Sequence, residues 1–505
     1  MKIQLETLDL LNRWPRFVLR DGYHAINILV RLGTIPIGEV MVRPARRREV
    51  THRRLRLVLK KKIAIPLLKN LVREGLAAGP EAMKGLPKEA FPPFTMALVD
   101  WRKSLKFVES ELLVPRGLPV PLKEWVIQAQ ARRNWPMPPV TVAVCTRDRE
   151  LILEGCIRHL QSLDYPNFEI LIVDNSRDSV PTREIAERCG VEYVRCQKGG
   201  LSRARNAAIA NARHDWIAFT DDDCRPEANW LKELVRPTQD QRCRCACGLV
   251  LPAQLENSAE ITFEVYGGLG RGCGPRIYDP GFLRASKSQP AATWRIGAGA
   301  NMLLHKGLMR QIGGYDVDMG PGPHSIGGCG EDTDVFYQVL RQGYNIHYAP
   351  RAIVHHFHRS SPKALRKQIY SYAVGHAAYH VRCLFAYGDY RSAIQLFWHL
   401  PRWFAKNLRR GINGRTKYPF SLVFLEIRGT LAGPFQYGAK KAVRWWKRLF
   451  MKPRAAGALG DPGDSACGIA SVANLAETPS AAVLKPVARD DYDDAHARNK
   501  PVRAA

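Results

Sequence analysis

Short apolar runs and helix-like segments alternate through the middle of this chain. Residues 140–145, 168–174, 191–196 and 216–220 read as buried strands, and residues 151–162, 182–189 and 201–212 between them read as helices. A strand followed by a helix, repeated at this pace, is typical of a parallel sheet that is covered by helices on both faces. The sequence therefore predicts an α/β fold with a doubly wound, mostly parallel sheet.

Composition divides the 505 residues into four regions. Residues 1–137 hold apolar runs on both sides of Gly33, which predicts a small module with a hairpin. Residues 138–359 hold the alternating strands and helices. Residues 360–454 predict basic amphipathic helices, and residues 455–505 are rich in Ala, Pro, Asp and Ser without periodicity, which predicts a disordered tail.

Three consecutive carboxylates, Asp221, Asp222 and Asp223, follow the apolar strand 216–220 directly. Like charges placed together at a strand end repel, and a divalent cation that prefers hard oxygen ligands relieves the repulsion. Ligands of open α/β sheets also bind at the carboxyl ends of the strands. The triplet therefore indicates a metal held ready for a diphosphate. The alternative is an acidic turn that caps a helix.

Other polar residues follow the neighbouring strands and fit a nucleotide. Asp174 ends the second strand, where a carboxylate can accept a hydrogen bond from a base or ribose. Glycines at 199 and 200 precede a helix whose arginines have the charge and fork geometry for phosphate oxygens, unless they form a solvated helix face. Together with the first strand end, the predicted donor-binding residues are Thr146, Arg147, Asp174, Arg203, Arg205, Asp221 and Asp222.

The chain carries 76 Lys and Arg against 47 Asp and Glu, a formal net charge of +29. Such an excess requires a polyanionic neighbour, which nucleic acid, anionic lipid or phosphorylated ligands could each supply. The charge is concentrated in residues 43–62 and 361–454. In the second block, aromatic residues stand beside cations, as in helices that lie on an anionic membrane surface. The alternative is a helical annex packed on the α/β domain with its basic face in water.

The twelve cysteines lack the paired spacing of a zinc site, and the first twenty residues lack a secretory apolar core. No apolar run reaches the roughly 20 residues of a membrane span. We therefore expect reduced thiols and a cytoplasmic protein, in a peripheral position on the inner face of the membrane if the basic helices bind lipid.

Five segments together resemble glycosyltransferase family 2, the inverting enzymes of GT-A fold, over about residues 139–359. They are Val142-Ala143-Val144-Cys145-Thr146-Arg147-Asp148-Arg149, residues 164–175, Gly200-Leu201-Ser202-Arg203-Ala204-Arg205-Asn206, the acidic triplet, and Gly330-Glu331-Asp332-Thr333-Asp334. The resemblance implies that Asp174 contacts the nucleobase and Asp221 the ribose side of the donor. It also implies that Asp223 holds Mg²⁺ or Mn²⁺ on the diphosphate.

By the same resemblance, Asp332 is the catalytic base, which takes the proton of the acceptor hydroxyl. The alternative is an acidic first turn of a helix. Residues 294–302 resemble the glycine-rich strand beside the acceptor and sugar pocket, which would contain Gly299, Asn301 and Glu331. Residues 353–359 resemble the family's His-rich terminus. Period-two placement puts His356 and His358 on one face as metal or diphosphate ligands, if they are not structural.

The predicted function is a metal-dependent, inverting transfer of a sugar from a nucleotide donor to an acceptor hydroxyl. The acceptor would be a glycan, a lipid-linked molecule or a small molecule, and the product a cell-envelope polysaccharide, a glycolipid or a specialised glycoside. Without a Gln-x-x-Arg-Trp motif, single-sugar transfer is favoured over polymerisation. A nucleotidyltransferase would need a glycine-rich activating loop. A nucleic-acid-binding protein would leave the clustered carboxylates unexplained, so no specific nucleic acid is expected as partner.

Overall fold

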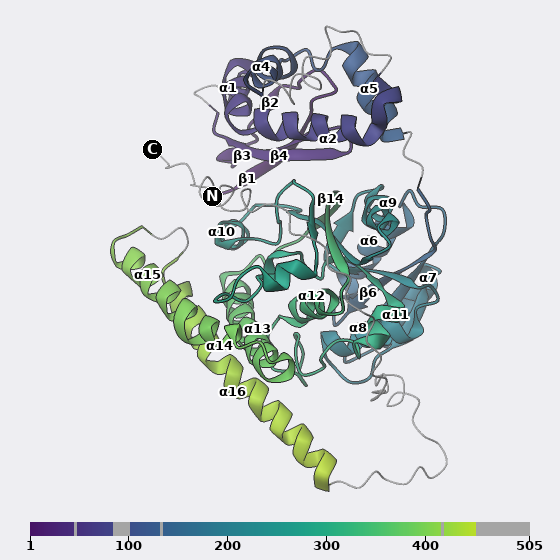
Figure 1. Cartoon of the computed structure of the whole chain (residues 1–505), viewed down its shortest axis with the longest axis vertical. Coiled ribbons are helices and arrows are strands. Elements are labelled where there is room, and N and C mark those ends of the chain that lie inside the picture. Colours follow the sequence, from purple (N-terminus) through teal and green to yellow (C-terminus); the bar gives the residue numbers. More distant parts are fainter. Residues whose placement is uncertain (45–47, 84–100, 132–134, 416–418, 451–505) are drawn as a thin grey trace. The chain divides into compact units, whose positions relative to one another are not determined.

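The computed structural model describes residues 1–44, 48–83, 101–131, 135–415 and 419–450 (Figure 1). These residues belong to one unit, Met1–Ile469. The predicted tail at 455–505 lies outside the described residues.

The N-terminal module combines a small sheet with helices and has its own apolar core. The predicted hairpin is confirmed: β3 and β4 pair antiparallel around Gly33, whose φ of 61° suits a residue without a side chain. The strands are β1 (Ile3–Asp9), β2 (Phe17–Val18), β3 (Ala25–Leu32), β4 (Ile35–Val42) and β5 (Glu49–Val50). The helices are α1 (His52–Lys62), α2 (Ala64–Met83), α4 (Trp101–Phe107), a π-helical turn (Val108–Leu112) and α5 (Val120–Ala131).

The central sheet has the order β10-β14-β11-β13-β9-β6-β7-β8, with β12 paired to β14. One half, β9-β6-β7-β8, is parallel, and the other half is mixed. The predicted strands are therefore confirmed. Their bounds are β6 (Val140–Thr146), β7 (Phe168–Asp174), β8 (Glu192–Arg195), β9 (Trp216–Asp221), β10 (Cys224–Pro226), β11 (Cys243–Pro252), β12 (Arg276–Tyr278), β13 (Asn301–His305) and β14 (Asn345–His356).

Both faces of the central sheet are buried. In β6, Ala143 belongs to one apolar cluster and its neighbours Val142 and Val144 to another. Because successive strand residues point to opposite faces, helices must cover the sheet on both sides. They are α6 (Glu150–Gln161), α7 (Val180–Arg188), α8 (Leu201–Asn211), α9 (Trp230–Val235), α10 (Ser258–Tyr266), α11 (Lys306–Gln311) and α12 (Glu331–Arg341), with 3₁₀ turns at Arg236–Gln239, Pro280–Arg284 and Thr293–Arg295.

The C-terminal region is helical, as predicted. It contains α13 (Pro362–Tyr387), α14 (Arg391–Ile394), a π-helical turn (Gln395–His399), α15 (Leu400–Ile412) and α16 (Ser421–Phe450). Helices α13 and α16 lie side by side (Figure 1), and the close approach depends on glycine: a Cβ on Gly433 would lie 2.4 Å from the Val374 carbonyl oxygen. Within the described ranges, no helix has the length and apolar character needed to cross a membrane.

Candidate active site

The ends of neighbouring strands bring the predicted residues to one edge of the central sheet. Thr146 at the end of β6 is paired with Asp174 at the end of β7, and Cys145 is paired with Asp221 at the end of β9. Because these three strands are parallel, their polar carboxyl ends share one edge. The convergence predicted from the order of the strands is confirmed.

The acidic triplet is held by a hydroxyl and by an arginine that the sequence does not predict for this site. Thr146 Oγ1 donates to Asp222 Oδ2 at 2.8 Å. Arg149 Nη1 donates to Asp222 Oδ1 at 2.5 Å and to Asp223 Oδ2 at 2.7 Å. Arg359 Nη1 lies 3.8 Å from Asp223 Oδ2. These cations allow adjacent carboxylates to be buried together.

The pKa values of Asp222 and Asp223 are shifted in opposite directions. Burial raises the pKa of Asp222 to about 6, against the opposing effect of Arg149. Burial acts upward on Asp223 as well, but hydrogen bonding and charge from His356, together with Arg149, lower its pKa to about 2. Asp223 is therefore ionised throughout the physiological range, as a metal-binding carboxylate must be.

Asp223, Cys224 and His356 form a group whose ligand atoms all lie within 4.8 Å of one another. Asp223 Oδ1 is buried, and the His356 imidazole, with Nε2 at 3.3 Å, is its partner. This carboxylate oxygen and the imidazole fit a divalent cation. Cys224 fits less well, because burial raises the pKa of its thiol well above the usual value.

His358 lies beside His356, as period-two placement predicts, but it does not join this group. Its Nδ1 is 2.9 Å from His356 Nδ1, and its Nε2 is 2.7 Å from Glu264 Oε1. Both ring nitrogens of His358 are therefore engaged, as are both of His356, and the role of His358 as a direct metal ligand stays a prediction. His358 can orient His356 from behind, because a metal-binding histidine commonly uses its second nitrogen for such a contact.

The predicted donor-binding residues differ in whether their polar atoms already have hydrogen-bond partners within the protein. Asp174 is fully buried and accepts from Tyr193 Oη at 2.8 Å and from Arg195 Nη1 at 3.0 Å. Arg147 Nη1 is buried without a hydrogen-bond partner. It would lie only 2.6 Å from a Cβ at position 199, so glycine there makes room for the guanidinium. Arg203, on the first turn of α8, is only partly buried, and its Nε also lacks a hydrogen-bond partner. Both arginines therefore retain an N–H that no group in the described parts of the chain accepts.

A second group forms around the start of α12. Asp332 Oδ2 accepts from the Gly299 N–H at 3.0 Å, and Oδ1 accepts from the Thr333 N–H at 2.7 Å. Arg205 Nη1 donates to Glu331 Oε1 at 2.8 Å, while Nη2 lies 3.9 Å from Asp221 Oδ1. The guanidinium thus connects the acidic triplet to the Glu-Asp pair.

The surroundings of Arg205 and Asn301 differ from those that the sequence predicts, while Gly299 lies beside Asp332 and its place in the acceptor pocket stays a prediction. The space beside Gly299 is filled by Arg205, whose Nη2 would lie 2.5 Å from a Cβ at that position. Arg205 is itself buried between carboxylates and does not face a donor phosphate. Asn301 is fully buried, donates to the carbonyl oxygens of Leu249 and Ala352, and accepts from Trp230 Nε1. Asn301 therefore supports the sheet and does not line an acceptor pocket.

We expect Arg205→Met to destabilise the protein strongly. The variant leaves the buried Glu331 carboxylate without its ion-pair partner, and breaking a buried pair in this way costs about 3–5 kcal/mol. Equilibrium urea unfolding would measure the loss. Arg116→Met, at an exposed ion pair with Glu111, is the control and should change stability little. Equal stability of both variants would mean that the Arg205–Glu331 pair does not hold the two groups together.

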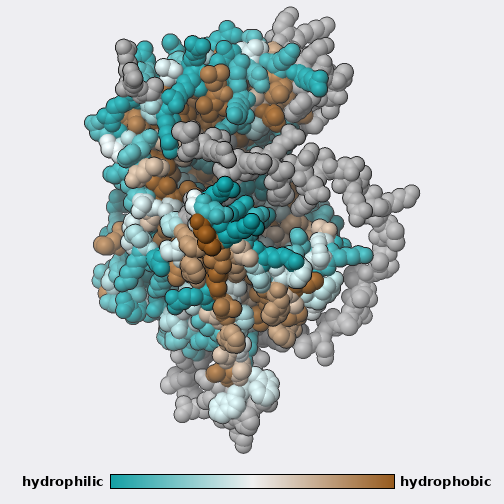
Figure 2. All heavy atoms as spheres, turned by 90° about the vertical axis from the view of Figure 1, so that its left-hand side faces the viewer, coloured by the Kyte–Doolittle hydropathy of each residue, from teal (hydrophilic) through white to brown (hydrophobic). Residues whose placement is uncertain are grey.

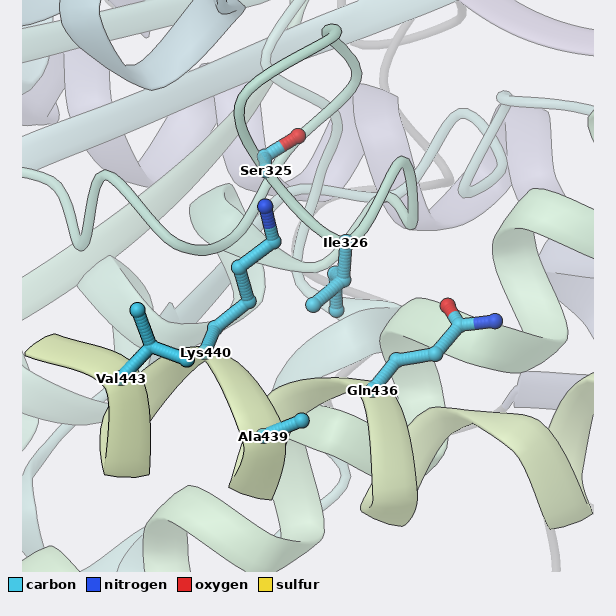
Figure 3. A pocket seen from close by; sticks show the side chains of 6 residues that line it. All are labelled: Ser325, Ile326, Gln436, Ala439, Lys440 and Val443. Carbon is cyan, nitrogen blue, oxygen red and sulfur yellow. The ribbon is translucent and has the colours of Figure 1, made fainter.

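A hollow of about 420 Å³ lies behind the loop that leads to α12 (Figure 3). Ser325 and Ile326 line it from the loop, and Gln436, Ala439, Lys440 and Val443 line it from α16. It contains none of the predicted site residues, so it is separate from the strand-end site.

Comparison with known proteins agrees with this arrangement. The model for glycosyl transferase family 2 matches residues 141–290, and the model for glycosyl transferase family group 2 matches residues 216–431. The chain belongs to glycosyltransferase family 2. The two matches span the strand-end site, α12 and α13, so the region that carries the candidate site is the one that identifies this glycosyltransferase.

Curated relatives match the same part of the glycosyltransferase. A pre-mycofactocin glycosyltransferase of Mycobacterium tuberculosis is 26% identical over 228 residues, which cover 44% of this chain and 43% of the relative. The succinoglycan biosynthesis protein ExoM of Rhizobium meliloti is 26% identical over 228 residues, 43% of this chain and 66% of that protein. The chain thus spans less than half the length of the mycobacterial relative.

A solved mannosyltransferase from Pyrobaculum calidifontis, in complex with GDP-Man and Mn²⁺, covers 68% of this chain and 84% of its own chain. Its sequence identity is 16% and its TM-score is 0.36.

Proposed function

We propose that this glycosyltransferase moves a sugar from a nucleotide-sugar donor to an acceptor hydroxyl, with inversion at the anomeric carbon. The observation that carries the proposal is that a carboxylate group suited to a metal ion and a carboxylate suited to a general base are connected through one buried arginine. Asp223 and His356 form a group suited to a divalent cation, Asp332 is held at the start of α12, and Arg205 connects their neighbours Asp221 and Glu331. A metal-assisted transfer with a separate general base needs both groups.

Asp332 acts as the general base. The N–H groups of Gly299 and Thr333 fix the orientation of its carboxylate. Asp332 removes the proton from the acceptor hydroxyl while that oxygen attacks the anomeric carbon from the face opposite the leaving nucleoside diphosphate. Attack from the opposite face inverts the configuration, and a single displacement requires no covalent intermediate on the enzyme.

The donor phosphates are held at the strand ends. Arg147 directs its unpaired N–H toward a phosphate oxygen, a role for which a guanidinium is suited. Mg²⁺ or Mn²⁺ held by Asp223 and His356 would neutralise the charge that develops on the leaving diphosphate. His358 and Glu264 then orient His356 from the far side.

We place the reaction in the cytoplasm and assign the enzyme single-sugar transfer to a glycan, lipid-linked or small-molecule acceptor. All eleven cysteines in the described parts of the chain are free, five of them within the central sheet or at its ends, in agreement with a reducing compartment.

Thermal stabilisation by nucleoside diphosphates tests the proposal directly. Each common nucleoside diphosphate is added to the purified chain with Mn²⁺ and, separately, with EDTA. A ligand that binds the folded state raises the melting temperature by mass action. We expect one nucleotide to raise the melting temperature with Mn²⁺ and to lose this effect with EDTA. If no nucleotide stabilises a folded sample, while nucleic acid binds with a steep salt dependence, the proposed function is wrong.

A further inference from the structure

Helix α16 exposes an apolar stripe on the side that faces away from α13. The fractional exposures are 51% for Phe424, 63% for Leu431, 79% for Phe435 and 55% for Trp446. Spacings of 7, 11 and 22 residues are close to whole numbers of helical turns, so these side chains share one face. The opposite face holds Gly429 and Gly433 against α13. The helix is therefore apolar on two sides, and its packing covers only one of them.

Ion pairs fix which side of α16 faces outward. Lys441 Nζ lies 2.9 Å from Asp316 Oδ2 and 3.2 Å from Asp318 Oδ2, and Arg444 also pairs with Asp318. Both carboxylates are buried. Rotating α16 to hide the stripe would take both of its cations away from Asp318 and leave Arg382 of α13 as the cation paired with Asp316. These ion pairs therefore keep the stripe exposed in the folded protein.

Helix α15 and the π-helical turn before it expose further aromatic residues and cations. Phe397 and Trp398 are 78% and 56% exposed, and Arg402 lies 3.2 Å from the centre of the Trp398 ring. The outer side of α15 carries the exposed residues Arg402, Lys406, Arg409 and Arg410. No acidic residue occurs between Asp389 and Glu426, or between Glu426 and Asp461. Figure 2 shows this side, with a hydrophobic band over the C-terminal helices below a hydrophilic cluster.

We propose that this surface, called here the C-terminal face, binds an anionic membrane by lying in its interface. It consists of the exposed side chains Phe397, Trp398, Arg402, Trp403, Lys406, Arg409, Arg410, Phe424, Leu431, Phe435 and Trp446. The aromatic and aliphatic groups enter the boundary between headgroups and acyl chains, and the cations contact anionic headgroups. A second copy of this chain is a poor occupant, because a self-paired contact would bring two strongly basic faces together.

Vesicle flotation of the full chain tests the proposal without reference to catalysis. We expect the protein to float with phosphatidylcholine vesicles that contain phosphatidylglycerol and not with pure phosphatidylcholine. Each Lys or Arg near an anionic surface contributes roughly a fivefold increase in affinity. The triple variant Arg402→Glu/Lys406→Glu/Arg409→Glu should therefore bind at least about 100-fold more weakly. Phe424→Ser/Leu431→Ser/Phe435→Ser should also lose flotation, with the charge unchanged.

A matched control distinguishes binding through the C-terminal face from attraction by positive charge elsewhere on the protein. Helix α1 carries the exposed residues Arg53, Lys61 and Lys62, and their triple replacement by Glu changes the net charge by the same amount. We expect this variant to float like the original chain. All substituted positions are exposed, so thermal melting should confirm that every variant folds.

Three outcomes overturn the proposal. One is equal loss of flotation in the α1 variant, which would mean unspecific attraction. A second is unchanged flotation of the Phe424→Ser/Leu431→Ser/Phe435→Ser variant. The third is a dimer, detected by light scattering, that this variant abolishes while the original chain fails to float. In that case the occupant of the stripe is a second copy of the chain.

Discussion

Asp332→Asn is expected to lower the rate of sugar transfer by about 10²–10⁴-fold, the usual contribution of a general base. The amide oxygen of Asn can still accept one of the two N–H groups that Asp332 accepts, from Gly299 at 3.0 Å or from Thr333 at 2.7 Å, so the variant should fold. The amide cannot remove a proton from the acceptor. Because the substitution lies on the acceptor side, the affinity for nucleoside diphosphate with Mn²⁺ should not change.

The measurement is single-turnover transfer with saturating donor, alongside the nucleotide melting shift of the same samples. Asp279→Asn, at an exposed carboxylate that accepts the Gly281 N–H, is the control and should keep full activity. Near-normal turnover of Asp332→Asn would remove Asp332 as the base. Loss of nucleotide stabilisation would instead place Asp332 in the donor site.

Asp223→Asn is expected to abolish the stabilisation that Mn²⁺ adds to nucleotide binding. Asp223 Oδ1 is buried beside His356 Nε2, and Asn cannot supply its negative charge. Even residues that only orient a metal ligand contribute about 10–100-fold to metal affinity. A direct ligand should contribute at least this much, so Mn²⁺ affinity should fall by at least about tenfold.

Titration calorimetry with Mn²⁺ alone measures this loss without any turnover. Asp178→Asn, at an exposed carboxylate that accepts the Val180 N–H, provides the comparison. If Asp223→Asn binds Mn²⁺ as tightly as the original chain, Asp223 does not belong to the metal site. His358→Gln should have a smaller effect than His356→Gln, because only His356 reaches Asp223.

Residues at strand ends were predictable because the backbone alone determines their position. Once residues 140–220 read as parallel strands, Thr146, Asp174 and Asp221 had to share an edge, and they do. The bounds of the four strands predicted between residues 140 and 220, correct to within one residue at each end, and the hairpin around Gly33 followed from apolar runs and turn chemistry in the same way. These features depend on local sequence and on one topological rule.

Contacts between side chains that lie far apart in the sequence were not predictable. Arg149 stands 73 residues before Asp222, and nothing local shows that its guanidinium reaches that carboxylate. Arg205 looks like a phosphate-binding arginine from its place at a helix start, but it pairs with Glu331, 126 residues away. The prediction for Asn301 was wrong for a related reason. Its buried side-chain amide forms hydrogen bonds with residues of three separate segments, one helix and two strands.

The ion pairs of Asp316 and Asp318 with α16 also have a consequence for the order of events during synthesis. Lys441 reaches Asp316 across 125 residues of chain. Asp316 also pairs with Arg382 of α13, but Lys441 and Arg444, the cations paired with Asp318 in the described parts of the chain, both belong to α16, so Asp318 lacks them until α16 has been translated. Closing so long a loop is entropically costly and slow. Until it closes, a carboxylate destined for burial stays in water and holds the segment open. A chain shortened before Lys441 would never complete this step, although every residue that we assign to catalysis would be present.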